Sequence, residues 1–373
     1  MVFGLTIFLL TFLASCSQQP AKPPASTPQV TVVTVKRQTI PATFDYVGVA
    51  QSSHMVEIRA RVEGYLDEIA YLEGGMVHEG ELLFQIDPKP FEAALAQAKG
   101  MMEQQQAALW DATQTVDRLQ PLYEQKAASK RDLDNATAQV MGYKAAIDAA
   151  NAQILQAEIN LGYTSIRTPI SGLTGQAIFR QGALVGPGAN SLLTTVSAID
   201  PIWVSFSVSE GDILKYQRKV TEGKLEFPRD MNFEVEVILS DGTTFPSKGK
   251  VDFADPTLRQ TTGSMTVRAV LPNQDALLRP GQFVRARLSG ATWPDAIIIP
   301  QASVMQGNKG LFVYVVNNDN QVESRAITAG DWYKDSWIID SGLNPGDRVV
   351  VDGTNKVMPG ATVVAEERKG IDS

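Results

Sequence analysis

Cysteine and histidine are the residues that this chain of 373 residues has least of. Its one cysteine, Cys16, excludes a disulfide within the chain and a cysteine metal cluster. Its two histidines, His54 and His78, leave too little material for a zinc site or a Ser-His-Asp triad. The chain also lacks the Walker A, G-x-S-x-G and H-E-x-x-H motifs. We therefore expect a protein that is not an enzyme, with no catalytic residues, no metal and no cofactor.

Positive charge is also scarce. The chain has 33 Lys and Arg against 41 Asp and Glu, a net charge of −8. A protein that binds nucleic acid normally presents a basic face, so we expect no nucleic-acid partner. The length predicts two or three domains and is sufficient for a sizeable core.

The N-terminal region contains an uncharged apolar run, 2–14, which is short for a membrane-spanning helix but suits a signal peptide. The run ends in Leu13-Ala14-Ser15-Cys16, which resembles the lipobox of bacterial lipoproteins, although no Lys or Arg precedes it. That resemblance implies cleavage before Cys16 and a diacylglycerol on its sulfur. We expect a signal peptide over 1–15 and a lipidated, proline-rich tether over 16–29.

Two segments of the chain repeat each other at a constant offset of 108 residues. Each is short, rich in β-branched residues and interrupted by glycines, which is typical of strands joined by tight turns. One small β-sandwich built from both segments buries both apolar faces. The repeated positions are Ile58, Gly64, Gly74 and Val77 in the first segment and Ile166, Gly172, Gly182 and Val185 in the second.

Between the two segments the hydrophobic period changes from two residues to three and a half. Apolar residues alternate at spacings of four and three over 91–123, interrupted only at Gln105, and over 133–161 without a break. This pattern predicts two helices in an antiparallel coiled coil. The turn is expected near 126–128, followed by Ser129 as the N-cap of the second helix. Each arm is about 50 Å long. An arm of this length usually serves to contact a distant partner or to assemble with other subunits.

The rest of the chain is predicted to be mostly β-structure. Residues 202–290 alternate in polarity, with a hairpin turn at Asp241-Gly242 and helical character only over 210–220. This indicates an antiparallel β-barrel, and a third β unit follows from Ala296, which the strand 30–35 is expected to join. The predicted fold class is therefore mostly β with one long α-helical hairpin.

Taken together, these motifs resemble the periplasmic adaptors, or membrane fusion proteins, of tripartite efflux pumps of the RND (resistance-nodulation-division) type. The stretches that carry the resemblance are 64–66, 85–88, 168–172, 182–185, 262–273, 278–284 and 342–347. The domains it implies are a membrane-proximal β domain (30–40 and 294–366), a β-barrel (41–56 and 199–293), a lipoyl-like domain (57–87 and 164–198), a hairpin (88–163) and a disordered tail (367–373).

The resemblance also implies a function and partners. The chain is expected to link an inner-membrane RND drug/proton antiporter to an outer-membrane channel, for efflux of drugs and other toxic compounds. It is expected to form a ring of six copies in the periplasm, anchored to the inner membrane by lipidated Cys16. The family's docking signature at the hairpin tip matches Arg118, Leu122 and Ser129 in type and spacing. Composition alone favours a helix-end arginine, a leucine beside the seam and an N-cap serine.

Three other functions stay open at this point. The main alternative is an adaptor of an ATP-driven (ABC-type) exporter. A lipoyl or biotinyl carrier domain needs a modifiable lysine on the turn between its halves, and here the hairpin replaces that turn. A periplasmic solute-binding protein would bind its ligand tightly without partners.

Overall fold

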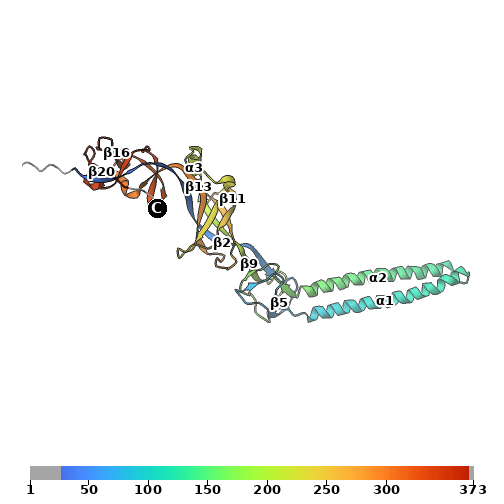
Figure 1. Cartoon of the computed structure of the whole chain (residues 1–373). Coiled ribbons are helices and arrows are strands. Elements are labelled where there is room, and N and C mark those ends of the chain that lie inside the picture. The colour runs from blue at the N-terminus through green and yellow to red at the C-terminus, as the bar shows by residue number, and fades with distance from the viewer. Residues whose placement is uncertain (1–26, 369–373) are drawn as a thin grey trace, which may run out of the picture. The chain divides into compact units, whose positions relative to one another are not determined.

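A computed structural model describes residues 27–368, so the expected signal peptide, Cys16 and most of the expected tether lie outside the described residues (Figure 1). The chain divides into two compact units. Among the described residues, the first unit comprises 27–42, 219–226 and 292–368, and the second comprises 43–218 and 227–291. The fold is mostly β with one long helical hairpin, which confirms the predicted class.

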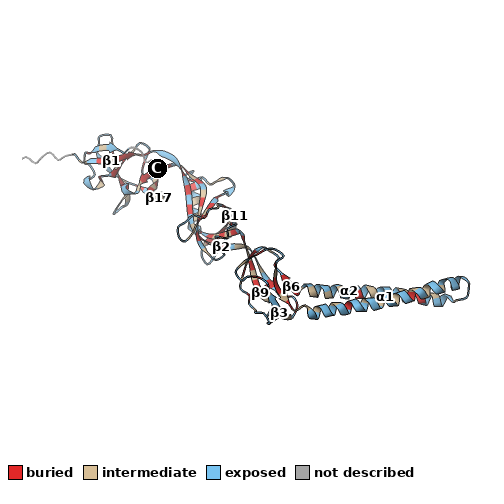
Figure 2. Ribbon diagram, turned by 60° about the horizontal axis from the view of Figure 1, so that its bottom comes forward, coloured by how far each residue is buried: buried red, intermediate tan, exposed pale blue. Residues whose placement is uncertain are grey.

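The hairpin consists of helices α1 (Lys89–Glu124) and α2 (Lys130–Gly162) in the second unit. Figure 2 shows that most of their surface is exposed and that buried positions are few. The predicted seam is confirmed, since its positions are buried or half-buried except for Tyr123 at the tip. The four buried residues are all alanines, which allows the two helices to approach closely: Ala98, Ala112, Ala136 and Ala150.

The two repeated segments fold together into one sandwich in the second unit. The first segment supplies β3 (Gly64–Ile69), β4 (Met76–Val77) and β5 (Leu82–Ile86). The second supplies β6 (Ser165–Arg167), β7 (Gly172–Thr174) and β8 (Leu184–Val185). Strands of the two segments pair antiparallel as β5 with β6, β3 with β8 and β4 with β7. Their buried apolar residues form a single cluster, which confirms the expected sandwich.

Six strands close a β-barrel. They are β2 (Arg37–Arg59), β9 (Leu192–Ser209), β10 (Glu234–Ile238), β11 (Gly249–Arg259), β12 (Ser264–Leu271) and β13 (Phe283–Pro300). Hydrogen bonding runs β13-β10-β11-β12-β9, and β2 pairs with both β9 and β13, so the ring has no free edge. Gly242 takes a φ of +87° in the turn after β10, as the Asp-Gly turn predicts. Helix α3 (Glu210–Thr221) directly follows β9, and the short helix η1 (Arg229–Met231) precedes β10.

The first unit is built on a sheet with the strand order β14-β15-β19-β1-β20, and β16 also pairs with β15. As expected, the N-terminal strand β1 (Gln29–Thr34) joins it, antiparallel to β19 (Arg348–Asp352) and parallel to β20 (Val364–Glu367). The other strands are β14 (Met305–Gly307), β15 (Gly310–Val316) and β16 (Val322–Ala326). A neighbouring ladder joins β17 (Thr328–Tyr333), β18 (Ser336–Ser341) and the end of β13. Short helices η2 (Gln301–Ser303) and η3 (Thr354–Lys356) complete the unit.

The C-terminal tail starts later than its sequence predicts. Glu367 is predicted to begin a disordered tail, but this residue belongs to β20 and pairs with Val32 of β1. The backbone N–H of Arg368 also donates to the carbonyl oxygen of Val32 at 2.9 Å. Side-chain bonds of 2.6 Å hold the strand further, from Gln29 to Glu366 and from Thr34 to Glu367. The parallel pairing with β1 therefore orders these residues, whereas 369–373 lie outside the described residues.

A buried ionic cluster lies inside the first unit. The Lys219 Nζ contacts Asp331 Oδ2 and Asp340 Oδ1, each at 3.1 Å. The same ammonium lies 4.8 Å from the ring centroid of Trp293, within the range of a cation–π interaction. Only 9% of the Lys219 side chain is exposed, so the two carboxylates and the ring replace the water that it loses.

Candidate functional site at the hairpin tip

The hairpin tip reverses the chain in a short loop, 125–129. The backbone N–H of Lys126 donates to the carbonyl of Tyr123 at 2.9 Å, and that of Ala127 donates to the carbonyl of Leu122 at 2.8 Å. Lys126 itself takes a φ of +63°. These bonds use carbonyls that the end of α1 would otherwise leave unpaired, which fixes the shape of the tip.

Ser129 begins α2 as its N-cap, as predicted. Its Oγ accepts a hydrogen bond from the backbone N–H of Asp132 at 3.2 Å and donates to the Asp132 carboxylate at 2.6 Å. The cap satisfies one of the free N–H groups at the start of the helix. The side chain is exposed, so the hydroxyl is held in a defined direction at the surface of the tip.

Arg118 and Leu122 lie one turn apart on α1 and therefore share a face of the helix. Arg118 is exposed, and its Nη2 donates to Thr115 Oγ1 at 3.1 Å. Leu122 is 42% exposed and lies outside the seam that holds the two helices together. The structure thus brings Arg118 and Leu122 onto one surface, while Ser129 lies across the loop at the start of α2.

The apolar side chains on the outer faces of the hairpin were not among the functional residues predicted from the sequence. The most exposed are Trp110 at 68% and Met141 at 65%, followed by Leu155 and Met101. None of them occupies a predicted seam position. Large apolar residues outside the seam are therefore the feature of the sequence that could have revealed them. Their side chains add exposed apolar area to the outer faces of the arm.

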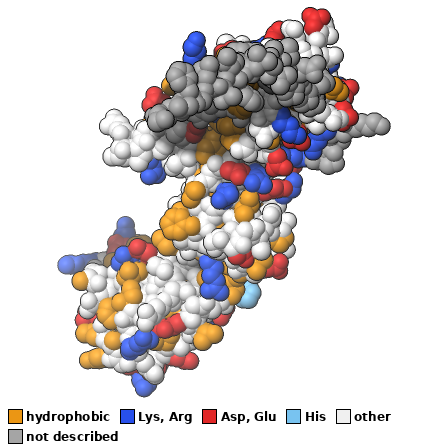
Figure 3. Space-filling model, turned by 90° about the vertical axis from the view of Figure 1, so that its left-hand side faces the viewer, with side chains coloured by type: hydrophobic (Ala, Val, Ile, Leu, Met, Phe, Trp, Pro, Cys, Tyr) orange, Lys and Arg blue, Asp and Glu red, His pale blue; other side chains and the backbone are white. Residues whose placement is uncertain are grey.

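Within 27–368 no group of three His, Cys, Asp or Glu side chains is arranged to hold a metal ion. On the face shown in Figure 3, side chains of both charges are interspersed. No described helix combines the length and the apolar character that crossing a membrane requires.

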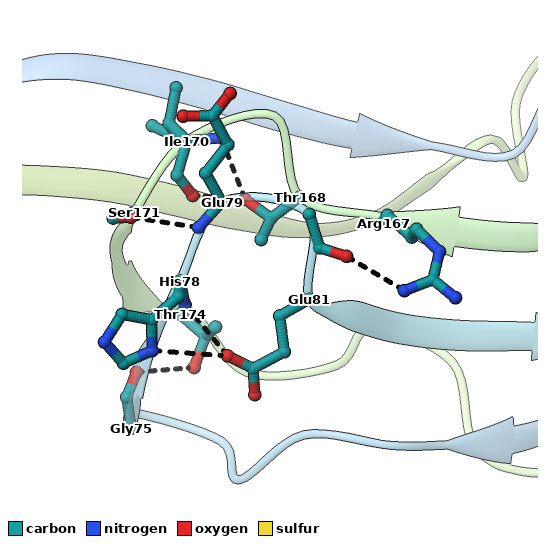
Figure 4. A network of polar contacts seen from close by, with 10 residues as sticks. Gly75, His78, Glu79, Glu81, Arg167, Thr168, Ile170, Ser171 and Thr174 are labelled. Carbon is teal, nitrogen blue, oxygen red and sulfur yellow. Dashed lines mark hydrogen bonds and ion pairs between the residues drawn. The ribbon is translucent and has the colours of Figure 1, made fainter.

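A polar network joins the two halves of the sandwich (Figure 4). The backbone of Thr168 accepts a bond from Gly80 N–H at 2.8 Å and donates one to the Glu81 carbonyl at 3.0 Å. The Ser171 hydroxyl accepts from Glu79 N–H at 2.9 Å. These groups satisfy one another across the halves, so the network serves to hold the sandwich together.

Three family models match consecutive parts of the chain. The barrel-sandwich hybrid domain of RND MFPs (membrane fusion proteins) matches residues 54–197. The β-barrel domain of RND MFPs matches 201–292, and their C-terminal permuted SH3 domain matches 295–356. All three models describe RND proteins, so the alternative of an ATP-driven exporter has less support.

Similar proteins agree with this assignment. The efflux pump periplasmic linker BepD of Brucella suis biovar 1 (strain 1330) is 37% identical over 96% of this chain and 91% of its own length. The multidrug efflux pump subunit AcrA of Escherichia coli (strain K12) is 40% identical over 91% of this chain and 86% of its own. The crystal structure of MacA from Actinobacillus actinomycetemcomitans has a TM-score of 0.53 at 25% identity, covering 86% of this chain and 98% of that one. This chain therefore belongs to the membrane fusion proteins of RND efflux pumps, a class of non-enzymatic periplasmic adaptors.

Proposed function

We propose that this adaptor links an inner-membrane RND drug/proton antiporter to an outer-membrane channel, and that the hairpin tip is the part that meets the channel. The observation that carries the proposal is the hairpin itself, with helices of 36 and 33 residues that are held together by a narrow apolar seam whose fully buried positions are alanines. Such an arm buries little and places its ordered tip about 50 Å from its base. Relatives are named as multidrug efflux pump subunits and periplasmic linkers, which supports drugs as the exported compounds.

Each residue of the proposed docking site has a distinct chemical task. The Arg118 guanidinium offers several donors to carbonyl or carboxylate oxygens of the channel. Leu122 supplies an apolar contact one turn further along α1, and Ser129 a directed hydroxyl at the start of α2. Since the tip is already ordered by its own hydrogen bonds, docking costs little conformational entropy.

The adaptor also associates with itself in a ring, which we place at six copies. The exposed Trp110 and Met141 support this, because they line the outer surface of the arm, where a neighbouring hairpin would cover them. The proposed anchor is a lipid on Cys16, which lies outside the described residues. Several acyl chains on one cysteine would hold the protein firmly to the inner membrane.

An engineered cysteine at the tip tests the docking. Cys16 is the only native cysteine, and its sulfur is consumed by lipid in the mature protein, so a new cysteine is the one free thiol. We expect Leu122→Cys to cross-link to the outer-membrane channel in cells. Met101→Cys is the matched control, because it is similarly exposed but lies about 30 Å down the same helix. Equal channel adducts from both positions, or none from Leu122→Cys, would refute docking through the tip.

Replacing the lipidated residue tests the anchor. In cells that lack the pump and the channel, we expect Cys16→Ser to move nearly all of the adaptor from the membrane fraction to the soluble periplasm. The reason is that the sulfur carries the acyl chains that supply membrane affinity. Ser17→Ala, next to it, should stay membrane-bound. Fractionation with immunoblotting measures both variants, and a Cys16→Ser protein that remains in the membrane pellet contradicts the anchor.

A further inference from the structure

The β-barrel holds a cavity of about 280 Å³ between its strands and helix α3. All of the lining residues belong to the second unit. The strands β2, β9, β11, β12 and β13 contribute to the wall, and α3 covers one side of it. The lining includes exposed Gln217, Met231 and Ala254, which places an opening to solvent beside them.

The wall of this cavity is aromatic. Phe44 meets Tyr216 edge-to-face with ring centroids 4.7 Å apart. Phe227 and Phe233 meet in the same manner at 5.5 Å, and each lies 6.4 Å from Phe44. The four rings thus form one connected cluster of edge-to-face contacts. Aromatic groups prefer this geometry, and the cluster offers ring edges and ring faces to a molecule in the cavity.

Two further properties of the lining restrict what can occupy the cavity. Among the described residues that line it, none is charged, so an ion entering it would lose its water without gaining a counter-charge. Met231 and Met265 supply flexible, polarizable side chains that adapt to different shapes and make favourable contacts with aromatic rings. The lining therefore suits a neutral aromatic molecule and disfavours a charged one.

The volume limits the size of this molecule. A dry apolar cavity of about 150 Å³ accepts benzene. A cavity of about 280 Å³ therefore has room for a molecule of two fused rings. It approaches the lower end of the range of ordinary small-molecule sites, which are mostly apolar and contain few polar groups.

We propose that this cavity is a binding site for small, neutral aromatic compounds of one or two rings. The site is distinct from the hairpin tip and does not rest on docking to the channel. The adaptor would thus bind compounds of this class directly, through its barrel.

Methionine methyl groups report on this site in the full chain. Naphthalene is the probe, and the ten methionines are labelled with ¹³C in their methyl groups for NMR titration. We expect saturable shifts for Met231 and Met265, and none for Met358, which is exposed and is not one of the lining residues. We also expect 2-naphthoate, the charged analogue, to bind at least tenfold more weakly. Equal affinity for the two probes, or shifts that do not saturate, would overturn the proposal.

A pair of tryptophan substitutions separates the cavity from general surface binding. Ala254→Trp fills the opening and should weaken naphthalene binding at least tenfold. Val47→Trp adds the same ring to an exposed position on β2 outside the lining, and should leave the affinity unchanged. Thermal unfolding checks that both variants fold. A folded Ala254→Trp protein that binds naphthalene as well as Val47→Trp would show that the cavity is not the site.

Discussion

Arg118→Asp is expected to weaken binding of the adaptor to its channel by at least about 2 kcal/mol, roughly 30-fold. The substitution removes a guanidinium at the proposed contact and puts a carboxylate where acceptor oxygens of the channel would lie. The helix itself should tolerate it, since Arg118 is exposed and bonds only to Thr115 in its own helix. Drug resistance of cells and cross-linking from the tip measure the loss, and circular dichroism measures helix content.

Arg131→Asp is the matched control for this prediction. Arg131 is also an exposed arginine at the tip, but it lies in the first turn of α2 and is not part of the docking signature. A carboxylate there interacts favourably with the helix N-terminus. We expect this variant to keep resistance close to the parent level. If both variants lose resistance equally, the tip responds to net charge and Arg118 has no particular role.

Lys219→Met is expected to destabilise the first unit by about 3–5 kcal/mol, because it removes the cation that two partly buried carboxylates contact. Hydrogen exchange measured by mass spectrometry follows each unit separately, which a single unfolding curve of a two-unit protein cannot do. Peptides from β17 and β18 should exchange much faster, while those from the hairpin keep their parent rates.

Lys224→Met provides the comparison. Lys224 forms a surface pair with Glu222 at 2.8 Å, and about half of each side chain is exposed, so its loss should cost less than about 1 kcal/mol. Adding Asp331→Asn and Asp340→Asn to Lys219→Met should recover part of the loss by removing the unpaired charges. Equal exchange in the two lysine variants would contradict a stabilising role for the buried cluster.

The hairpin was the part of the fold most accessible from sequence. Its seam is a local repeat, so each helix can be recognised without knowledge of its partner, and Ser129 marks the start of α2 with a cap whose geometry the structure confirms. The roles of Arg118, Leu122 and Ser129 in docking stay predictions. The structure shows two of them on one face of α1, but the groups that they would bind belong to another protein.

The strands were harder to delimit. The domain boundaries predicted at 40/41 and 56/57 both fall inside β2, which runs without interruption from Arg37 to Arg59. Likewise β13 continues from Phe283 to Pro300 across 293/294. A boundary inside a continuous strand has no turn residues to reveal it. The cluster around Lys219 was invisible for another reason, since its carboxylates are more than a hundred residues away along the chain.

The pairing of β1 has a consequence for how the protein is made. Thr31 pairs with Asp352, so β1, the first of the described strands to be synthesised, has no partner until almost the whole chain has been made. The hairpin and sandwich can form earlier from nearer segments, and the first unit closes last at the highest loop-closure entropy. A chain interrupted before β19 would therefore expose β1 as an unpaired, apolar strand. Proteases and chaperones of the envelope can bind such a strand, so it would distinguish an incomplete chain from a folded one.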